Sequence, residues 1–226
     1  MEVRIFQIRL IIKNYILYIM KKIVNYIYES LNAVDSGVDG NIKNLIEKTL
    51  SKIDCKLFKQ IKSDDPDRFD ISKENEKLFI DAFESKKFKA LSTADYNDLI
   101  NDVKFNDLSA SEKADFDAKN GDIIIVDEDN KEICHIDFKI SEKFLGAVSV
   151  GSLVKFNENG VYVCINKSSN AYKLASHKVL CDLVKNDSSL INTCVNAYKG
   201  HEVTFEGNKY MSEDFIKGND INRLVK

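Results

Sequence analysis

The segment that most constrains the fold is residues 121–141, GDIIIVDEDNKEICHIDFKIS. It holds two runs rich in β-branched and apolar residues, Ile123 to Val126 and Ile133 to Ile140, separated by the polar pair Asp129 and Asn130. Such runs predict β-strands, and Asp and Asn tolerate the positive φ angles of tight hairpin turns. We therefore predict a β-hairpin with a two-residue loop at 129–130, around which the rest of the chain packs.

The register of this hairpin brings charged residues together. With Asp129 and Asn130 as the loop, counting back along both strands places Asp122 directly opposite Asp137. Directly opposed residues share a face of the sheet, with Cβ atoms roughly 4.5–5.5 Å apart. Lys139 lies two residues after Asp137, so it projects from the same face, roughly 6.5 Å further along. The sequence predicts two carboxylates and an ammonium group on one face.

The two predicted carboxylates, Asp122 and Asp137, repel each other unless a positive group lies between them. Their oxygens are hard ligands suited to Mg²⁺, which usually binds through one or two carboxylates and substrate phosphate oxygens. Lys139 beside such an ion can orient or help deprotonate a water, or stabilise charge on a phosphate. This arrangement points to metal-assisted phosphodiester hydrolysis. The alternative is a buried hairpin with an ordinary Asp–Lys surface pair.

The pattern Asp122, a hairpin, and then Asp137-Phe138-Lys139 resembles the active-site signature of the PD-(D/E)XK nuclease superfamily. Within that superfamily it is most similar to the type II restriction endonucleases. One position departs from the pattern, because Gly121 stands where the family usually has proline. The resemblance implies catalytic roles for Asp122, Asp137 and Lys139. It also implies a Mg²⁺ site at Asp122, Asp137 and Phe138.

The activity implied by this resemblance is Mg²⁺-dependent, site-specific hydrolysis of double-stranded DNA, as in a restriction-modification system. A two-fold pair of subunits reads a palindrome and cuts both strands, so we expect a homodimer. The lysine-, asparagine- and isoleucine-rich composition suggests an A/T-rich genome and an A/T-rich target. Two alternatives stay open. One is a structure-specific repair or recombination nuclease of the same superfamily, and the other is a non-catalytic DNA-binding or assembly protein on this fold.

A third acidic residue, supplied by a helix before the hairpin, is also implied by the resemblance. The pattern predicts helices at 41–52 and 73–86, the second capped by Ser72. Glu76, on the border of the apolar stripe of the second helix, is the first candidate. Glu47 on the earlier helix is the second. The alternative for both is a solvated helix glutamate.

A polar loop follows an apolar run, Val161 to Ile165, which predicts a buried strand. Its amide, hydroxyl and ammonium groups are of the kinds that contact phosphates and base edges in DNA. The loop consists of Asn166, Lys167, Ser168, Ser169 and Asn170. We predict a DNA contact there, and the alternative is an ordinary solvated loop.

The remaining patterns complete an α/β architecture, a mixed central sheet flanked by helices. Further helices are expected at 95–103, 110–119, 143–156 and 172–184, and a hairpin at Glu206-Gly207-Asn208 precedes a short closing helix. In the predicted register His135 lies opposite Ile124, which is the next pair on the same face after Asp122 and Asp137. A core histidine with hydrogen-bond partners inside the protein is favoured there over a metal ligand. We expect one nuclease domain at 35–226.

The N-terminal segment, residues 1–34, carries a helical stripe of isoleucines. The spacings are 4, 3, 4 and 4, for Ile12, Ile16, Ile19, Ile23 and Ile27. Its longest apolar run, Tyr15 to Met20, is too short for a membrane span. Two interpretations stay open: a helix packed on its own domain, or a contact in the dimer.

Charge and cysteine usage narrow the class of protein. The net charge is −3, and residues 63–142, with 11 basic and 22 acidic residues, hold most of the acid. A uniform basic coat is excluded, so DNA binding would depend on local basic edges and on added Mg²⁺. The five cysteines form no C-x-x-C pair and indicate reduced thiols of a cytoplasmic protein. The sequence contains no spacing of cysteines and histidines typical of a zinc site. It also contains no phosphate-cradling glycine loop, and we expect no organic cofactor.

Overall fold

A computed structural model describes residues 34–61, 68–195 and 200–226. The predicted isoleucine stripe, and with it the choice between core helix and dimer contact, lies outside these residues. None of the helices in the described ranges has the length and apolar character needed to cross a membrane. The cysteines all lie in these ranges and are free thiols, three of them buried.

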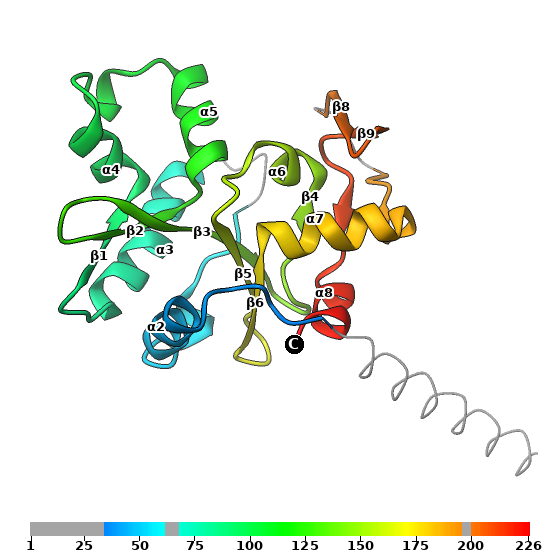
Figure 1. Cartoon of the computed structure of the whole chain (residues 1–226), viewed down its shortest axis with the longest axis horizontal. Coiled ribbons are helices and arrows are strands. Elements are labelled where there is room, and N and C mark those ends of the chain that lie inside the picture. Colours follow the sequence, from blue (N-terminus) through cyan, green and yellow to red (C-terminus); the bar gives the residue numbers. More distant parts are fainter. Residues whose placement is uncertain (1–33, 62–67, 196–199) are drawn as a thin grey trace, which may run out of the picture.

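A mixed sheet of strand order β1-β2-β3-β5-β6 lies at the centre of the molecule (Figure 1). Neighbouring strands are antiparallel except β3 and β5, which run parallel. The strands are β1 Phe88–Ser92, β2 Ile123–Asp127, β3 Glu132–Ser141, β5 Gly160–Asn166 and β6 Ala171–Ser176. The predicted α/β class with a mixed central sheet is therefore confirmed, and the predicted apolar strand at 161–165 is β5.

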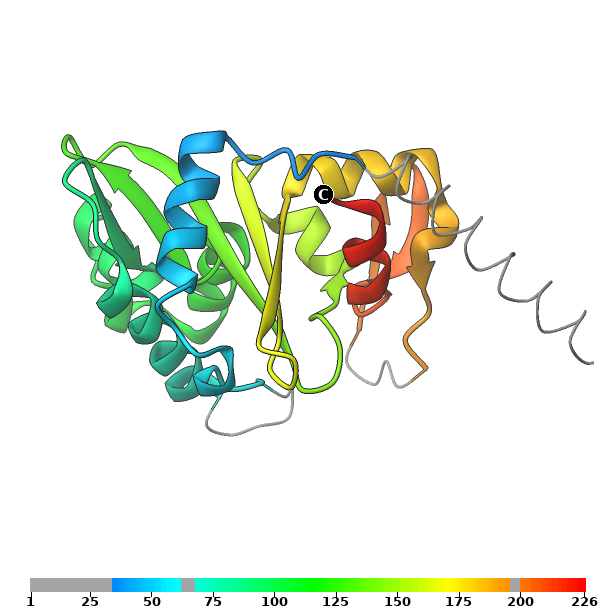
Figure 2. The ribbon, with the colours of Figure 1, turned by 90° about the horizontal axis from the view of Figure 1, so that it is seen from below.

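Helices cover both faces of this sheet. One face packs against α2 Gly40–Leu50 and α3 Arg68–Ala82, and Figure 2 shows α2 lying across the strands. The other face carries α4 Thr93–Ile100, α5 Ala110–Asn120, α6 Val150–Lys155 and α7 His177–Asn186. Short 3₁₀ turns are η1 Cys55–Leu57, η2 Phe105–Asp107 and η3 Ser188–Leu190.

The C-terminal part adds small β elements beside α6 and α7. A second sheet has the order β4-β10-β7, from Val148–Ser149, Phe215–Ile216 and Ile191–Asn192. The predicted hairpin near residue 207 is confirmed as β8 Glu202–Phe205 and β9 Asn208–Met211. The predicted closing helix is α8 Gly218–Leu224.

The β2–β3 hairpin has the predicted register in its middle. Ile123 pairs with Ile136 and Ile124 with His135, and the Asp122 amide donates to the Ile136 carbonyl at 2.8 Å. This hydrogen bond places Asp122, like Ile123, opposite Ile136, so the predicted pairing of Asp122 with Asp137 does not form. The predicted register is therefore confirmed from Ile123 to Ile125 and ends one residue before Asp122.

The closed end of the same hairpin differs from the prediction. A β-bulge after Ile125 shifts the register, so that Val126 pairs with Glu132. The Asp127 carboxylate accepts hydrogen bonds from the amides of Asp129 and Lys131, at 3.0 and 2.9 Å. The predicted two-residue loop was wrong because this carboxylate organises a wider turn.

Strand alternation in β3 fixes which residues face the core. Phe138 is buried between Phe58 and Phe79, with ring centroids 5.3 and 5.6 Å away. Its neighbours Asp137 and Lys139 must then project from the opposite face. The face that receives Phe138 is covered by one continuous apolar cluster under α2 and α3.

The opposite face has two apolar clusters instead of one. Tyr96 of α4 covers Ile124 and Val126 at the β1–β2 end. At the β5–β6 end, α6 and α7 cover Tyr162 and other apolar residues. Figure 1 shows α4 and α5 at one end of the sheet and α6 and α7 at the other. The polar residues of β3 lie between the two clusters.

Three helix predictions needed correction. The helix predicted at 172–184 begins only at His177, because 171–176 form β6 and place alternate residues, Tyr172 and Leu174, on the α2 side. The helix predicted at 143–156 is shortened to α6, because Val148 and Ser149 pair with β10. The helix predicted at 73–86 begins at residue 68, so Ser72 lies inside α3 and is no cap.

Candidate active site

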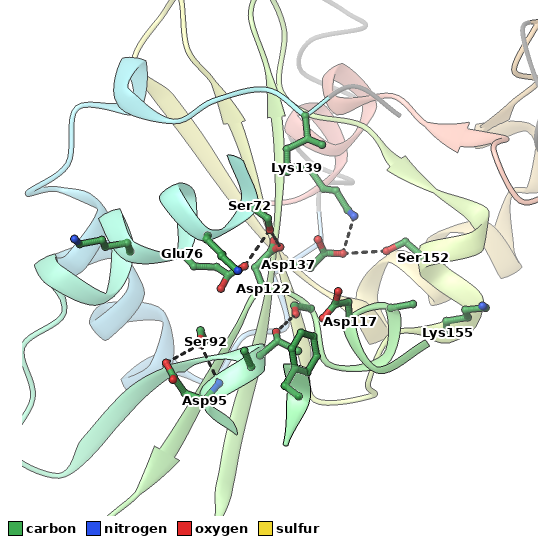
Figure 3. A pocket seen from close by; sticks show the side chains of 18 of the residues that line it. Ser72, Glu76, Ser92, Asp95, Asp117, Asp122, Asp137, Lys139, Ser152 and Lys155 are labelled. Carbon is green, nitrogen blue, oxygen red and sulfur yellow. Dashed lines mark hydrogen bonds and ion pairs between the residues drawn. The ribbon is translucent and has the colours of Figure 1, made fainter. Parts of the chain in front are cut away.

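A cleft of about 860 Å³ opens between the two apolar clusters. Its walls come from α3, the first turn of α4, the last turn of α5 and the first turn of α6. The predicted residues Asp122, Asp137, Lys139 and Glu76 all line it (Figure 3). Glu47 does not line it; its charge acts on Tyr172 under α2.

The backbone before Asp122 is held by several hydrogen bonds. Helix α5 ends at Gly121, whose φ of 73° turns the chain toward β2. The Thr93 hydroxyl donates to the Gly121 carbonyl, and His135 Nδ1 lies 3.1 Å from the carbonyl oxygen of Asn120. These contacts fix the direction in which Asp122 enters the cleft.

The Asp122 carboxylate has a polar neighbour at each oxygen. Oδ2 accepts the Phe138 amide at 2.7 Å, and Oδ1 lies 3.3 Å from the hydroxyl oxygen of Ser72, whose one proton goes to the nearer Glu76. Burial, followed by the negative charge of Asp137, raises the pKa of Asp122 to about 8. A carboxylate held in this way binds a proton readily in the absence of a cation.

Asp137 and Lys139, two residues apart on the same face of β3, form a close ion pair. Lys139 Nζ lies 2.7 Å from Asp137 Oδ2, and the two side chains are 22% and 14% exposed. Burial lowers the pKa of Lys139, but the charge and hydrogen bond of Asp137 outweigh it, so the pKa is raised overall. Lys139 is therefore a cation at neutral pH.

Glu76 reaches the cleft from α3. Its Oε1 accepts the Ser72 hydroxyl at 3.0 Å, so Ser72 lies between Glu76 and Asp122. Burial raises the pKa of Glu76 to about 7, and the charge of Asp117 adds to the rise. The first choice for the third acid therefore does lie beside Asp122, linked to it by one hydroxyl group.

Two cleft residues were missed from the sequence. Asp117, in the last turn of α5, lines the cleft, and burial raises its pKa to about 6. Ser152, in the first turn of α6, donates its hydroxyl to Asp137 Oδ2 at 3.0 Å. No local pattern marks either residue. Asp117 reaches the cleft because α5 lies against β3, and Ser152 because α6 lies beside Asp137 in the fold.

The donor set for a metal ion is small. In the described part of the chain, no group of three or more His, Cys, Asp or Glu side chains has the arrangement of a metal site. Asp122 and Asp137 offer two carboxylates. Phe138 can add only its main-chain carbonyl, which faces the β2 side, as its amide does. Mg²⁺ needs no more than one or two carboxylates from the protein, so these hard oxygens fit that ion once Asp122 has lost its proton.

The loop 166–170 does not line the cleft. Its polar side chains are bonded within the protein. These bonds join Asn166 to the carbonyl of Lys143 (3.1 Å), Lys167 to the carboxylate of Glu142 (2.6 Å) and Asn170 to the amide of Cys55 (2.7 Å); the Ser168 hydroxyl also donates to the carbonyl of Glu142. The predicted DNA contact of this loop stays a prediction.

His135 occupies the favoured core position. Its side chain is fully buried, and Nε2 lies 3.1 Å from the Glu132 carboxylate. With its other nitrogen against the carbonyl of Asn120, both ring nitrogens have partners. His135 therefore supports the backbone before Asp122 from behind and does not line the cleft.

Comparisons of the chain with protein-family models, with curated proteins and with solved structures gave no significant match.

Proposed function

We propose that this protein is a Mg²⁺-dependent type II restriction endonuclease of the PD-(D/E)XK superfamily. It would hydrolyse double-stranded DNA at a specific, palindromic, A/T-rich site and act as a homodimer. The observation that carries the proposal is that Asp122, Asp137 and Lys139 line one cleft, close enough for the charges of Asp137 and Lys139 to act on the Asp122 carboxyl group. A surface Asp–Lys pair would need neither the buried acid beside it nor the cleft.

In this proposal Asp122, Asp137 and the Phe138 carbonyl hold Mg²⁺. When bound, Mg²⁺ supplies Lewis acidity that stabilises negative charge on a phosphate. Burial of Asp122, followed by the negative charge of Asp137, makes the ionised site costly without a cation, which is the physical reason to expect one. The protein would then be poised to take up the ion together with a phosphate.

Lys139 and Glu76 have different roles in the proposed reaction. Because the pKa of Lys139 is raised, its ammonium group orients water and stabilises charge on the phosphate, and does not act as a base. Glu76, with a pKa of about 7, is matched to accepting a proton from the attacking water at neutral pH. This assignment makes Glu76 the general base and Lys139 the electrostatic catalyst.

The α3 wall supplies positive charge for the DNA backbone. Lys73 and Lys77 line the cleft beside Glu76, and neither forms an ion pair with another described residue. They are one helical turn apart, about 6 Å along the axis, a span comparable to one or two nucleotides of a strand. A local basic edge of this kind reconciles a net charge of −3 with DNA binding.

Digestion of a defined A/T-rich DNA with Mg²⁺, followed by mapping of the ends, tests the proposal. We expect discrete fragments with ends at one sequence, and no cleavage with EDTA. Cleavage without discrete fragments would indicate a structure-specific nuclease. DNA binding without any cleavage, in both the wild type and Lys139→Ala, would indicate a non-catalytic binding protein.

A further inference from the structure

One oxygen of Asp137 accepts two donors from different parts of the fold. Lys139 Nζ lies 2.7 Å from Oδ2, and the Ser152 hydroxyl lies 3.0 Å from the same atom (Figure 3). Oδ1 accepts no hydrogen bond from any described residue. The carboxylate is therefore anchored on one side and open on the other.

The direction of the Ser152 hydrogen bond follows from counting protons. The Ser152 hydroxyl has one proton and two neighbours, Asp137 at 3.0 Å and the Tyr162 hydroxyl at 3.4 Å. A charged acceptor at the shorter distance is favoured. The Tyr162 hydroxyl has its own acceptor in His177 Nδ1, at 3.3 Å. Ser152 is left to donate to Asp137.

The same group of residues fixes the ammonium of Lys139. Its Nζ lies 5.8 Å from the centroid of the Tyr162 ring, within the range of a cation–π contact. Tyr162 is fully buried beneath α6, and so gives the lysine a rigid surface. The ion pair with Asp137 Oδ2 then fixes the position of the ammonium group over the ring.

We propose that Ser152 is a positioning residue, which holds the Asp137 carboxylate so that Oδ2 anchors Lys139 and Oδ1 stays available to a metal ion. The inference rests on the proposed nuclease function. Without the hydroxyl group, the carboxylate can rotate about its Cβ–Cγ bond and carry the lysine with it. Loss of such outer partners typically costs about 10–100-fold in metal affinity or activity.

Helix α6 offers a matched control. The hydroxyl of Ser149 caps this helix by accepting the Ser152 amide at 3.2 Å, and it makes no bond to Asp137. Ser149→Ala therefore weakens the same helix without removing the contact to the carboxylate. Ser152→Ala removes that contact and leaves the cap.

The test measures kcat and KM for cleavage of the mapped DNA site, and Mg²⁺ binding by calorimetry without DNA. For Ser152→Ala we expect kcat to fall about 10–100-fold with KM changed less than about twofold, and Mg²⁺ affinity to fall. Ser152→Thr should recover most of kcat, because it restores the hydroxyl. Ser149→Ala should lower the melting temperature and keep kcat within about twofold of wild type.

Wild-type kcat and wild-type Mg²⁺ affinity in Ser152→Ala would overturn the inference, as would an equal loss of kcat in Ser149→Ala. Failure of the proposed function looks different. If the wild type cleaves no DNA, the nuclease proposal fails, while the Mg²⁺ affinities of the wild type and Ser152→Ala still decide the role of Ser152. If the wild type binds no Mg²⁺, both proposals fail.

Discussion

The cleft and the loop at 166–170 are both rich in polar side chains, and both were candidate functional regions from the sequence. The two regions differ in how their polar groups are partnered. In the loop, Asn166, Lys167 and Asn170 form hydrogen bonds or ion pairs within the protein. In the cleft, burial and like charge raise the pKa of Asp122 and Glu76. Polar residues that satisfy one another serve the fold, whereas acids crowded at a cost to stability mark a place for a ligand.

The largest expected effect is the loss of cleavage on removal of a cleft charge. Lys139→Ala should reduce single-turnover cleavage with Mg²⁺ by about 10²–10³-fold, because an electrostatic donor at the phosphate is lost. Lys167→Ala removes a lysine of similar burial that pairs with Glu142, and should change the rate less than about twofold. Equal losses in the two variants would erase the distinction between the regions.

In metal-free protein the free energy of unfolding should fall with rising pH, because the buried Asp122 must then lose its proton. The folded state holds the Asp122 proton up to a pKa of about 8, against 3.8 for the ordinary group. Stability from this group is therefore complete below pH 4 and is lost as the pH rises toward 8. Asp122→Asn removes the charge, so its advantage over wild type should grow with pH, to roughly 1–3 kcal/mol at pH 8. Urea denaturation in EDTA at pH 5 and pH 8 measures it.

Mg²⁺ should offset the free-energy cost of ionising Asp122 in the folded protein. At pH 8, adding Mg²⁺ to wild type should raise the free energy of unfolding by an amount that grows with the logarithm of the ion concentration. Asp122→Asn should show little of this rise, because one of the two carboxylate ligands is gone. A rise of equal size in both proteins would place the bound ion outside the cleft.

The salt dependence of DNA binding should distinguish cleft lysines from loop lysines. Each phosphate contact contributes about 0.9 to the slope of log K against log salt, so Lys73→Ala with Lys77→Ala should reduce the slope by about 1.8. Lys167→Ala should leave it unchanged. The measurement is made in a Lys139→Ala background, which slows cleavage. A reduced slope only in the Lys167 variant would move the DNA-binding surface to the loop.

The smallest effect is expected at Asn170. Asn170→Ala removes the acceptor of the Cys55 amide and should lower stability by about 1 kcal/mol. A purely structural role predicts unchanged cleavage across all target variants, and this is the result that we expect. A shift in target preference would instead establish the DNA contact predicted from the sequence.

The site was predictable where it depends on local periodicity. Alternation along β3 and the register from Ile123 to Ile125 follow from one segment, because strand side chains alternate with a period of two. Glu76 was chosen because the resemblance implies a third acid on a helix before the hairpin, and its place at the border of the apolar stripe does bring it to the cleft, although the helix begins earlier than predicted. These predictions needed no knowledge of distant contacts.

The remainder depended on contacts between distant parts of the chain. Ser152 reaches Asp137 only because β3 pairs with β5 and α6 packs against Tyr162. The strand at 171–176 was assigned to a helix, because a short apolar run does not distinguish the two periods. Its pairing with β5 decided the outcome.

The left-handed backbone at Gly121 restricts how this sequence can change over evolutionary time. The pattern that the segment resembles usually has proline there, and a proline ring requires a φ near −65°, opposite in sign to 73°. Even alanine would place its Cβ 2.6 Å from the carbonyl oxygen of Ile136. Exchange for proline would therefore require a new ending for α5, so the conformation of this helix end depends on the glycine.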